Sequence, residues 1–170
     1  MATERFQNDL QLAEKLLYSE CGFQLQHLVW NSESANYGAC SFELNNYKIQ
    51  YRVANITPTK IGQFVAIWKR NNSGITAPFD VADSLDFLII SVRDSENFGQ
   101  FVFPKSVVVA KGIFSQNEKG GKRGIRVYAP WDKPENKQAI KTQAWQEHYF
   151  VTIKEDFSED LKKIKRILLV

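Results

Sequence analysis

The 170-residue sequence is poor in the side chains that build metal centres and disulfide frameworks. It contains two cysteines, Cys21 and Cys40, and two histidines, His27 and His148. None of them has the spacing of a zinc site, and two thiols are too few for a disulfide framework. We therefore expect the cysteines to be ordinary small side chains in a reducing compartment, and we expect no cofactor.

Long apolar runs are missing as well. No segment approaches the roughly 20 apolar residues that a membrane-spanning helix needs. The stretch Met1-Ala2-Thr3-Glu4-Arg5 leads into no apolar segment of the signal-peptide type. The G-x-S-x-G nucleophile elbow and the G-x-G-x-x-G dinucleotide loop are also absent. We expect a cytoplasmic protein of about one domain, without a membrane partner.

Positive charge is concentrated in the middle of the chain, although the formal net charge is only +3. Residues 60–141 hold 13 Lys and Arg against 8 Asp and Glu, whereas residues 1–59 hold 4 against 6. Aromatic residues make up 13% of the sequence, and several stand beside these cations. This distribution favours an anionic partner for the middle segment.

Helical and strand patterns predict an α+β fold with a mixed β-sheet flanked by helices. Apolar residues recur at helical spacing between Glu4 and Glu20, with Thr3 as a cap. The run Leu85–Val92 is apolar throughout, which indicates a central strand buried on both faces. We predict one domain over residues 1–170 with a C-terminal helical extension, 153–170. The other expected strands are 41–44, 47–53, 63–69, 99–103 and 125–128, and the other expected helices are 105–110 and about 132–150, the latter capped by Asp132 and Glu135.

A polar loop, Ser115–Gly124, carries three glycines among Lys119, Lys122 and Arg123, and Arg126 follows it. Glycines let backbone N–H groups turn toward an anion, and the cations add charge. Because Lys122 is followed by Arg123 rather than Ser or Thr, this is not a Walker A loop. We interpret the loop as a phosphate contact; the alternative is a solvated loop without a ligand.

Aromatic residues flank cations at three places. These are Trp68 before Lys69 and Arg70, Phe101 and Phe103 before Lys105, and Tyr128 and Trp131 after Arg126. Rings that stack on unpaired bases, beside cations that hold phosphates, make a single-strand binding site. We predict that Phe103 and Trp131 stack, although a strand buries one face and about half of such rings belong to the core.

Three carboxylates, Asp80, Asp83 and Asp86, precede the central strand at spacings of three. A two-carboxylate nuclease needs such an acid together with an acid-x-Lys string on the next strand. The only acid-x-Lys strings are Glu135-Asn136-Lys137 and Asp160-Leu161-Lys162, and neither lies on an expected strand. Turn and capping roles therefore explain the aspartates more simply.

Five strings occur together in one order. They are Gly62–Val65 with Trp68–Arg70, Phe98–Lys105, Lys119–Arg123 with Arg126–Tyr128, Pro130-Trp131, and Thr142-Gln143 followed by Trp145-Gln146. Over about residues 40–150 the sequence resembles the MepB-like family of bacterial proteins. The resemblance implies a divergent PD-(D/E)xK endonuclease-like core whose metal-binding acids are not kept. Some members are encoded beside a MarR-type repressor and a multidrug efflux pump, and the family has no established reaction, so it supplies no catalytic residue.

We predict a nucleic-acid-binding domain that binds single-stranded DNA or RNA in preference to duplex DNA, without efficient catalysis. The residues predicted to bind are Gln63, Lys69, Arg70, Gln100, Phe103, Lys105, Lys119, Lys122, Arg123, Arg126 and Trp131.

Three alternatives remain. The first is a Mg²⁺-dependent nuclease that uses Asp83 or Asp86 with Glu43 and Lys105, and the second is a small-molecule binder linked to drug efflux. The third is a protein-interaction domain that uses the C-terminal stripe of Leu161, Ile164 and Leu168.

Overall fold

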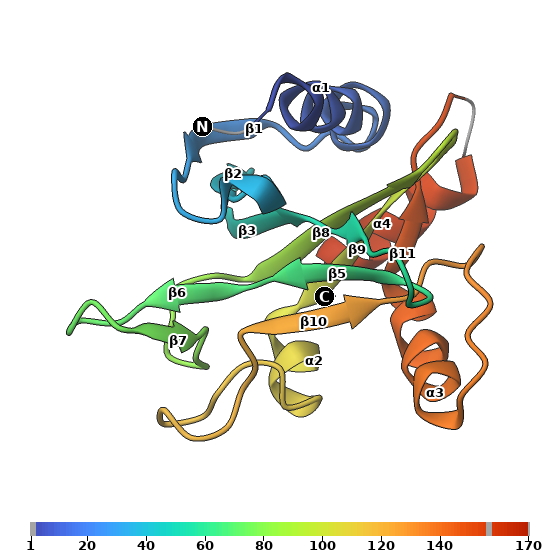
Figure 1. Ribbon diagram of the computed structural model, residues 1–170. Coiled ribbons are helices and arrows are strands. Elements are labelled where there is room, and N and C mark those ends of the chain that lie inside the picture. The colour runs from blue at the N-terminus through green and yellow to red at the C-terminus, as the bar shows by residue number, and fades with distance from the viewer. Residues whose placement is uncertain (1–2, 156–157, 170) are drawn as a thin grey trace.

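The computed structural model describes residues 3–155 and 158–169, and a six-stranded mixed sheet forms its centre (Figure 1). The strand order is β1-β2-β3-β8-β9-β11. Strands β3 and β8 are parallel, and every other neighbouring pair is antiparallel. The strands are β1 (Leu25–Trp30), β2 (Cys40–Leu44), β3 (Tyr47–Val53), β8 (Phe87–Asp94), β9 (Asn97–Pro104) and β11 (Phe150–Thr152).

Strand β8 is buried on both faces and divides the interior into two cores. Because side chains alternate along a strand, Phe87 and Ile89 enter one core, called the first core, whereas Leu88 and Ile90 enter the other, called the second core. The apolar run predicted a central strand, and this prediction is confirmed.

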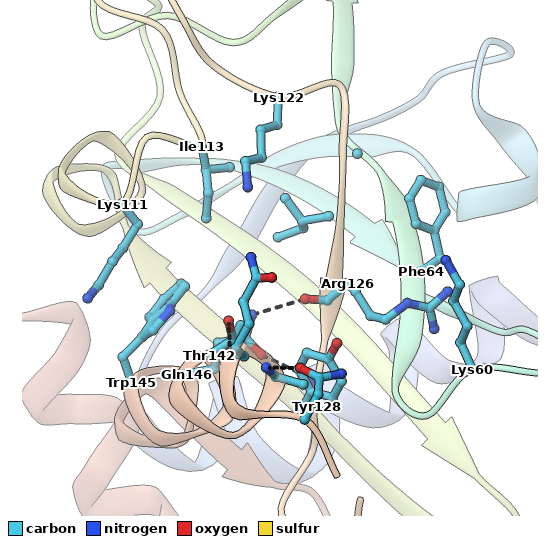
Figure 2. Close-up of a pocket in the computed structure, with 15 residues that line it drawn as sticks. Lys60, Phe64, Lys111, Ile113, Lys122, Arg126, Tyr128, Thr142, Trp145 and Gln146 are labelled. Carbon is cyan, nitrogen blue, oxygen red and sulfur yellow. Dashed lines mark hydrogen bonds between the residues drawn. The ribbon is translucent and has the colours of Figure 1, made fainter. Parts of the chain in front are cut away.

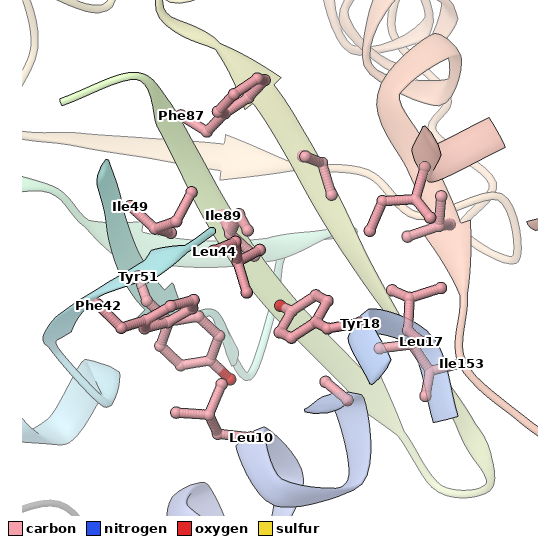
Figure 3. Packing of buried hydrophobic residues seen from close by; sticks show 14 of the residues in the cluster. Leu10, Leu17, Tyr18, Phe42, Leu44, Ile49, Tyr51, Phe87, Ile89 and Ile153 are labelled. Atoms are coloured by element: carbon pink, nitrogen blue, oxygen red, sulfur yellow. The ribbon is translucent and has the colours of Figure 1, made fainter. Parts of the chain in front are cut away.

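Helices cover the first face of the sheet. Helix α1 (Glu4–Ala13) continues through a π-helical turn, η1 (Glu14–Tyr18), and a 3-10 turn, η2 (Ser19–Cys21). The Thr3 side chain caps the first turn, as predicted, by accepting from the Phe6 amide at 3.4 Å. Helix α4 (Ser158–Leu168) packs on the same side. Figure 3 shows Leu10 near Phe42 and Tyr51, and Leu17 beside Ile153, in this first core.

A second layer covers the opposite face. It contains a three-stranded sheet, β10-β5-β4, and the hairpin β6-β7. Its strands are β4 (Asn55–Ile56), β5 (Gln63–Ala66), β6 (Trp68–Arg70), β7 (Thr76–Pro78) and β10 (Gly124–Val127), and its helices are α2 (Lys105–Ala110) and α3 (Lys137–Gln146). The connection from β3 to the parallel strand β8 runs through this layer, so strands β4 to β7 lie on one side of the sheet (Figure 1).

The structure confirms the α+β class and the mixed sheet flanked by helices, but it corrects several elements. Helix α3 begins at Lys137, because the Asn136 side chain caps it by accepting from Ala139 N at 2.8 Å. Asp132 instead accepts from the Ala129 amide. The expected strand 63–69 is divided into β5 and β6. The sequence patterns missed the outer strands β1 and β11.

The C-terminal apolar stripe belongs to the first core. Ile164 and Leu168 are fully buried, and Leu161 is partly buried against the same cluster. The stripe is therefore not available as an interaction surface in this conformation. No helix among the described residues has the length and apolar composition to cross a bilayer.

Candidate functional site

A basic groove lies on the second layer, between strands β5 and β10 and helix α3 (Figure 2). It consists of two adjoining hollows of about 470 and 540 Å³. These volumes fall within the roughly 300–1,000 Å³ of typical ligand sites. The two hollows share the wall residues Lys60, Arg126, Tyr128, Asn136 and Ala139.

Four cations come to this groove from four different segments. Lys60 precedes β5, Lys111 follows α2, Lys122 precedes β10, and Arg126 lies on β10. Within residues 3–155 and 158–169 none of the four has a carboxylate within 4 Å, and Glu135 is the only acid in the walls. The groove therefore presents uncompensated positive charge.

Arg126 is held across the groove by backbone oxygens. Its Nη1 donates to the carbonyls of Ile61 and Gly62, each at 3.2 Å. The register of the β5–β10 pair places Arg126 opposite Phe64, and alternation along the strand puts Tyr128 on the same face as Arg126. Val127, between them, is fully buried.

Three partly exposed rings, those of Phe64, Tyr128 and Trp145, line the first hollow. Trp145 packs on the buried Phe103 at a centroid distance of 5.3 Å, and Lys111 Nζ lies 5.2 Å from the centroid of the Trp145 ring. Tyr128 is fixed through its backbone, because its amide donates to Gln146 Oε1 at 2.8 Å. Gln146 Nε2 also donates to the Arg126 carbonyl, so helix α3 is fastened to β10 (Figure 2).

Of the predicted binding residues, the groove brings together Lys122 and Arg126 only. It adds Lys60, Lys111, Phe64, Tyr128 and Trp145, which the predicted set did not include. The three rings had a usable signal in the sequence. Tyr128 stands two residues after Arg126 at the end of the expected strand 125–128, so both share a face. Phe64 and Trp145 belong to the first and the last of the five strings, whereas Lys60 and Lys111 belong to none.

Three predicted residues are buried and cannot contact a ligand at the surface. Phe103 is fully buried in the second core and packs on Phe101 and Trp145. Gln100 is fully buried in the first core, and Gln63 donates to the Arg93 carbonyl from beneath β5. Their positions do not support the predicted ligand contacts. Strand β9 is buried on both faces, so Gln100 and Phe103 are enclosed on opposite sides of the sheet, and Gln63 lies on the inward face of β5.

Trp131 was also predicted to stack on a base, and its ring is mainly a packing element. It meets Phe150 edge to face at a centroid distance of 5.6 Å, and its Nε1 is buried. Lys105 Nζ donates to the Asp83 carbonyl, and Lys69 Nζ lies 2.6 Å from Asp83 Oδ1. Neither lysine lines the basic groove.

The predicted basic loop, residues 115–124, is anchored by the side chain of Asp80. Asp80 accepts from Ser115 Oγ at 2.7 Å, Ala82 N at 2.9 Å and Glu118 N at 3.0 Å. These hydrogen bonds lower the pKa of Asp80 from 3.8 to about 2. Lys119 and Arg123 are exposed on this loop, and Arg123 donates to the Thr76 carbonyl at 3.0 Å.

The carboxylates of the nuclease alternative have separate partners. Asp83 is bound by Lys69 and by the Asp80 amide, Asp86 accepts from the Lys48 amide, and Glu43 contacts His27. In the part of the chain that the structure describes, no three His, Cys, Asp or Glu side chains gather as metal ligands. The convergence that would favour this alternative is therefore not found.

The family model of MepB-like proteins matches residues 31–152. The chain belongs to the MepB-like family. A crystal structure of MepB superposes with a TM-score of 0.74 at 35% identity, over 78% of this chain and 89% of that chain. The bacterial homing endonuclease I-Ssp6803I aligns with a TM-score of 0.46 at 15% identity, over 85% of this chain and 90% of that chain. Among curated proteins no match is found.

The MepB-like region contains every residue of the basic groove, from Thr59 to Gln146. Helices α1 and α4 lie outside it and cover the opposite face of the sheet. The resemblance inferred from the five strings is thus confirmed.

Proposed function

We propose that this MepB-like protein binds single-stranded nucleic acid in the basic groove. The observation that carries the proposal is the combination of four cations that have no carboxylate partner among the described residues with three partly exposed rings around one hollow surface. Cations along such a groove hold phosphates, and aromatic faces stack on bases that are not already paired. Lys60, Lys111, Lys122 and Arg126 supply the charge, and Tyr128 and Trp145 are the rings proposed to stack.

The charged rim distinguishes this proposal from a small apolar ligand. A drug-like molecule is normally bound in a mostly apolar cavity with a few polar groups. Here the hollow is open, and its walls combine the four cations with amide side chains of Asn136, Gln138 and Gln146. A polyanion fits this surface better than an apolar molecule does.

The test is fluorescence anisotropy with a short labelled RNA strand, the matching DNA strand and the DNA duplex, all with 5′-hydroxyl ends. We expect the single strands to bind more tightly than the duplex. The double variant Lys122→Ala/Arg126→Ala should weaken binding about 10- to 30-fold at about 0.1 M salt, because two phosphate contacts are lost.

The matched control is Lys162→Ala/Arg166→Ala, which removes the same residue types from exposed positions of α4 on the opposite face. This control should bind as the unmodified protein does. Equal losses in both double variants would show a non-specific charge effect and contradict the proposal. Probe length after incubation with Mg²⁺ reports cleavage, and a shortened probe would favour the nuclease alternative instead.

A further inference from the structure

Arg52 on β3 is a charged side chain in the interior without a charged partner. It is only 2% exposed, and its Nε has no hydrogen-bond partner. Its Nη1 donates to the Tyr51 carbonyl at 2.8 Å and reaches Gln50 Oε1 at 3.4 Å. No carboxylate among the described residues lies within 4 Å of the guanidinium. Buried charges are normally paired, because removing an ion from water is strongly unfavourable.

The Arg52 side chain faces a cavity of about 240 Å³ between β3 and the β6-β7 hairpin. We call it the Arg52 cavity, and it shares no residue with the basic groove. Its walls consist of Asn31, Glu33, Ser34, Gln50, Arg52, Trp68, Lys69, Arg70 and Phe79. Lys69 and Arg70, two of the cations that the sequence predicted as ligands, therefore belong to this second site.

The charges around the Arg52 cavity leave the guanidinium uncompensated. Arg70 Nε is paired with Glu33 Oε1 at 2.7 Å, and Lys69 Nζ with Asp83 Oδ1 at 2.6 Å. Burial lowers the pKa of Arg52 to about 10, so the group is still protonated at neutral pH. Phe79 packs on it, with the guanidinium carbon 5.7 Å from the ring centroid, and brings no opposite charge.

The number of donors indicates the class of anion. Arg52 is the uncompensated cation of the cavity, and the paired cations Lys69 and Arg70 line the same small volume with the neutral side chains of Asn31, Ser34 and Gln50. A carboxylate brings two oxygens and one negative charge, whereas a phosphate group has three or more acceptor oxygens and carries close to two negative charges. The planar arginine fork matches phosphate geometry.

We propose that the Arg52 cavity binds a phosphate group, which supplies the counter-charge that Arg52 lacks. This site is independent of the basic groove. The phosphate is either free in solution or the terminal phosphate of a nucleic-acid strand, and the two sources share the same recognition chemistry.

The first test is thermal unfolding of the full chain with millimolar inorganic phosphate, against sodium chloride and acetate at matched ionic strength. Phosphate should raise the melting temperature of the unmodified protein in a saturable way, because a ligand that binds only the folded state stabilises it. Chloride and acetate should not. An unchanged melting temperature in phosphate, or an equal rise in acetate, would overturn the proposal.

Arg52→Met tests the assignment, since methionine keeps the length and apolar packing of the stem. The variant should lose the phosphate response and melt at the same or a higher temperature in phosphate-free buffer, because an unpaired buried charge has been removed. Arg166→Met, on an exposed position of α4, is the matched control and should keep the response. A response retained in Arg52→Met would overturn the assignment, as would its loss only in Lys122→Ala/Arg126→Ala.

A second variant keeps the test valid if Arg52→Met does not fold. Glu33→Gln changes a partly exposed side chain and removes the only carboxylate in the cavity wall. Inorganic phosphate should then bind about three- to tenfold more tightly by calorimetry, since a like charge has been removed from the site. Unchanged or weaker binding would count against a phosphate site.

Dinucleotides with and without a 5′-phosphate separate the two sources. Tighter binding of the phosphorylated form than of inorganic phosphate supports a strand end as the ligand. A preference for inorganic phosphate supports the free ion. Because the strands that test the basic groove carry 5′-hydroxyl ends, either proposal can fail while the other holds.

Discussion

Gln100 lies in a buried chain of hydrogen bonds on the α1 side of the six-stranded sheet. Its Oε1 accepts from Tyr18 Oη at 2.6 Å, and its Nε2 donates to Ser91 Oγ at 2.9 Å. The Ser91 and Tyr51 hydroxyls are 2.7 Å apart. Burial raises the pKa values of Tyr18 and Tyr51, so both phenols stay protonated and available as donors. This chain of hydrogen bonds joins η1, β3, β8 and β9, which indicates a structural role for Gln100.

Gln100→Leu should lower the free energy of unfolding by about 2–3 kcal/mol, because the buried Tyr18 and Ser91 hydroxyls lose a partner. Urea unfolding measures the change. Gln11→Leu, at an exposed position of α1, is the control and should stay within about 0.5 kcal/mol of the unmodified protein. The folded Gln100→Leu variant should bind single strands normally. If the variant lost affinity for single strands while its stability was unchanged, Gln100 would have to be a binding residue.

At the scale of elements, the string Gly-Gln-Phe-Val occurs twice, at 62–65 and at 99–102, and the two copies have similar surroundings. At each copy the glycine lies beneath an aromatic ring and the glutamine is buried. A Cβ on Gly99 would lie 2.3 Å from Phe150 Cζ, and one on Gly62 would lie 2.7 Å from Tyr128 Cδ1. The first copy begins β5 and supports the Tyr128 ring in the groove, whereas the second lies within β9. The string therefore reports close packing rather than ligand contact.

The hydrogen bonds of Asp80 hold the basic loop against the segment between β7 and β8. Since they lower the pKa of Asp80 from 3.8 to about 2, the folded state favours the carboxylate. This stabilisation is present above the unfolded pKa and is lost as the pH falls through the folded value. We expect Asp80→Asn to be less stable than the unmodified protein at neutral pH, and the difference between them to shrink between about pH 4 and pH 2.

Urea midpoints of both proteins across this pH range test the linkage. A difference that stays constant from neutral pH down to about pH 2 would show that the Asp80 charge does not stabilise the loop. If the stability difference between the two proteins disappeared near neutral pH, a group other than Asp80 would be responsible for the pH dependence.

For the whole molecule, the sequence predicted those helices and strands in which buried apolar residues recur at a regular spacing. The central strand β8, the hairpin of β2 and β3, and the first helix all follow from alternation or helical spacing. The short strands β4, β7 and β11 have two or three residues each, too few for any period to be visible. Helix α3 was expected too early because the Asp132 carboxylate closes a turn instead of capping a helix.

The site was harder to predict than the fold, because it is assembled by tertiary contacts. A lysine has the same appearance in sequence whether it faces a groove, as Lys111 does, or pairs with a carboxylate, as Lys69 does. Phe103 and Trp145 stand 42 positions apart, yet the first forms the buried support of the second. The packing of α3 against β10 decides which ring remains accessible.

At the scale of the whole molecule, the position of the excess positive charge leads to a prediction about how single-strand affinity depends on salt. If the four groove cations each hold a phosphate, the logarithm of single-strand affinity should fall against the logarithm of salt with a slope of about −3, since each contact contributes about −0.7. Affinity should then drop about 50-fold between about 50 and 200 mM salt. Lys122→Ala/Arg126→Ala should reduce the slope to about −1.4, while Lys162→Ala/Arg166→Ala should leave it unchanged. Anisotropy titrations over a salt series decide this, and the same slope in all three proteins would mean that the strand follows another face of the molecule.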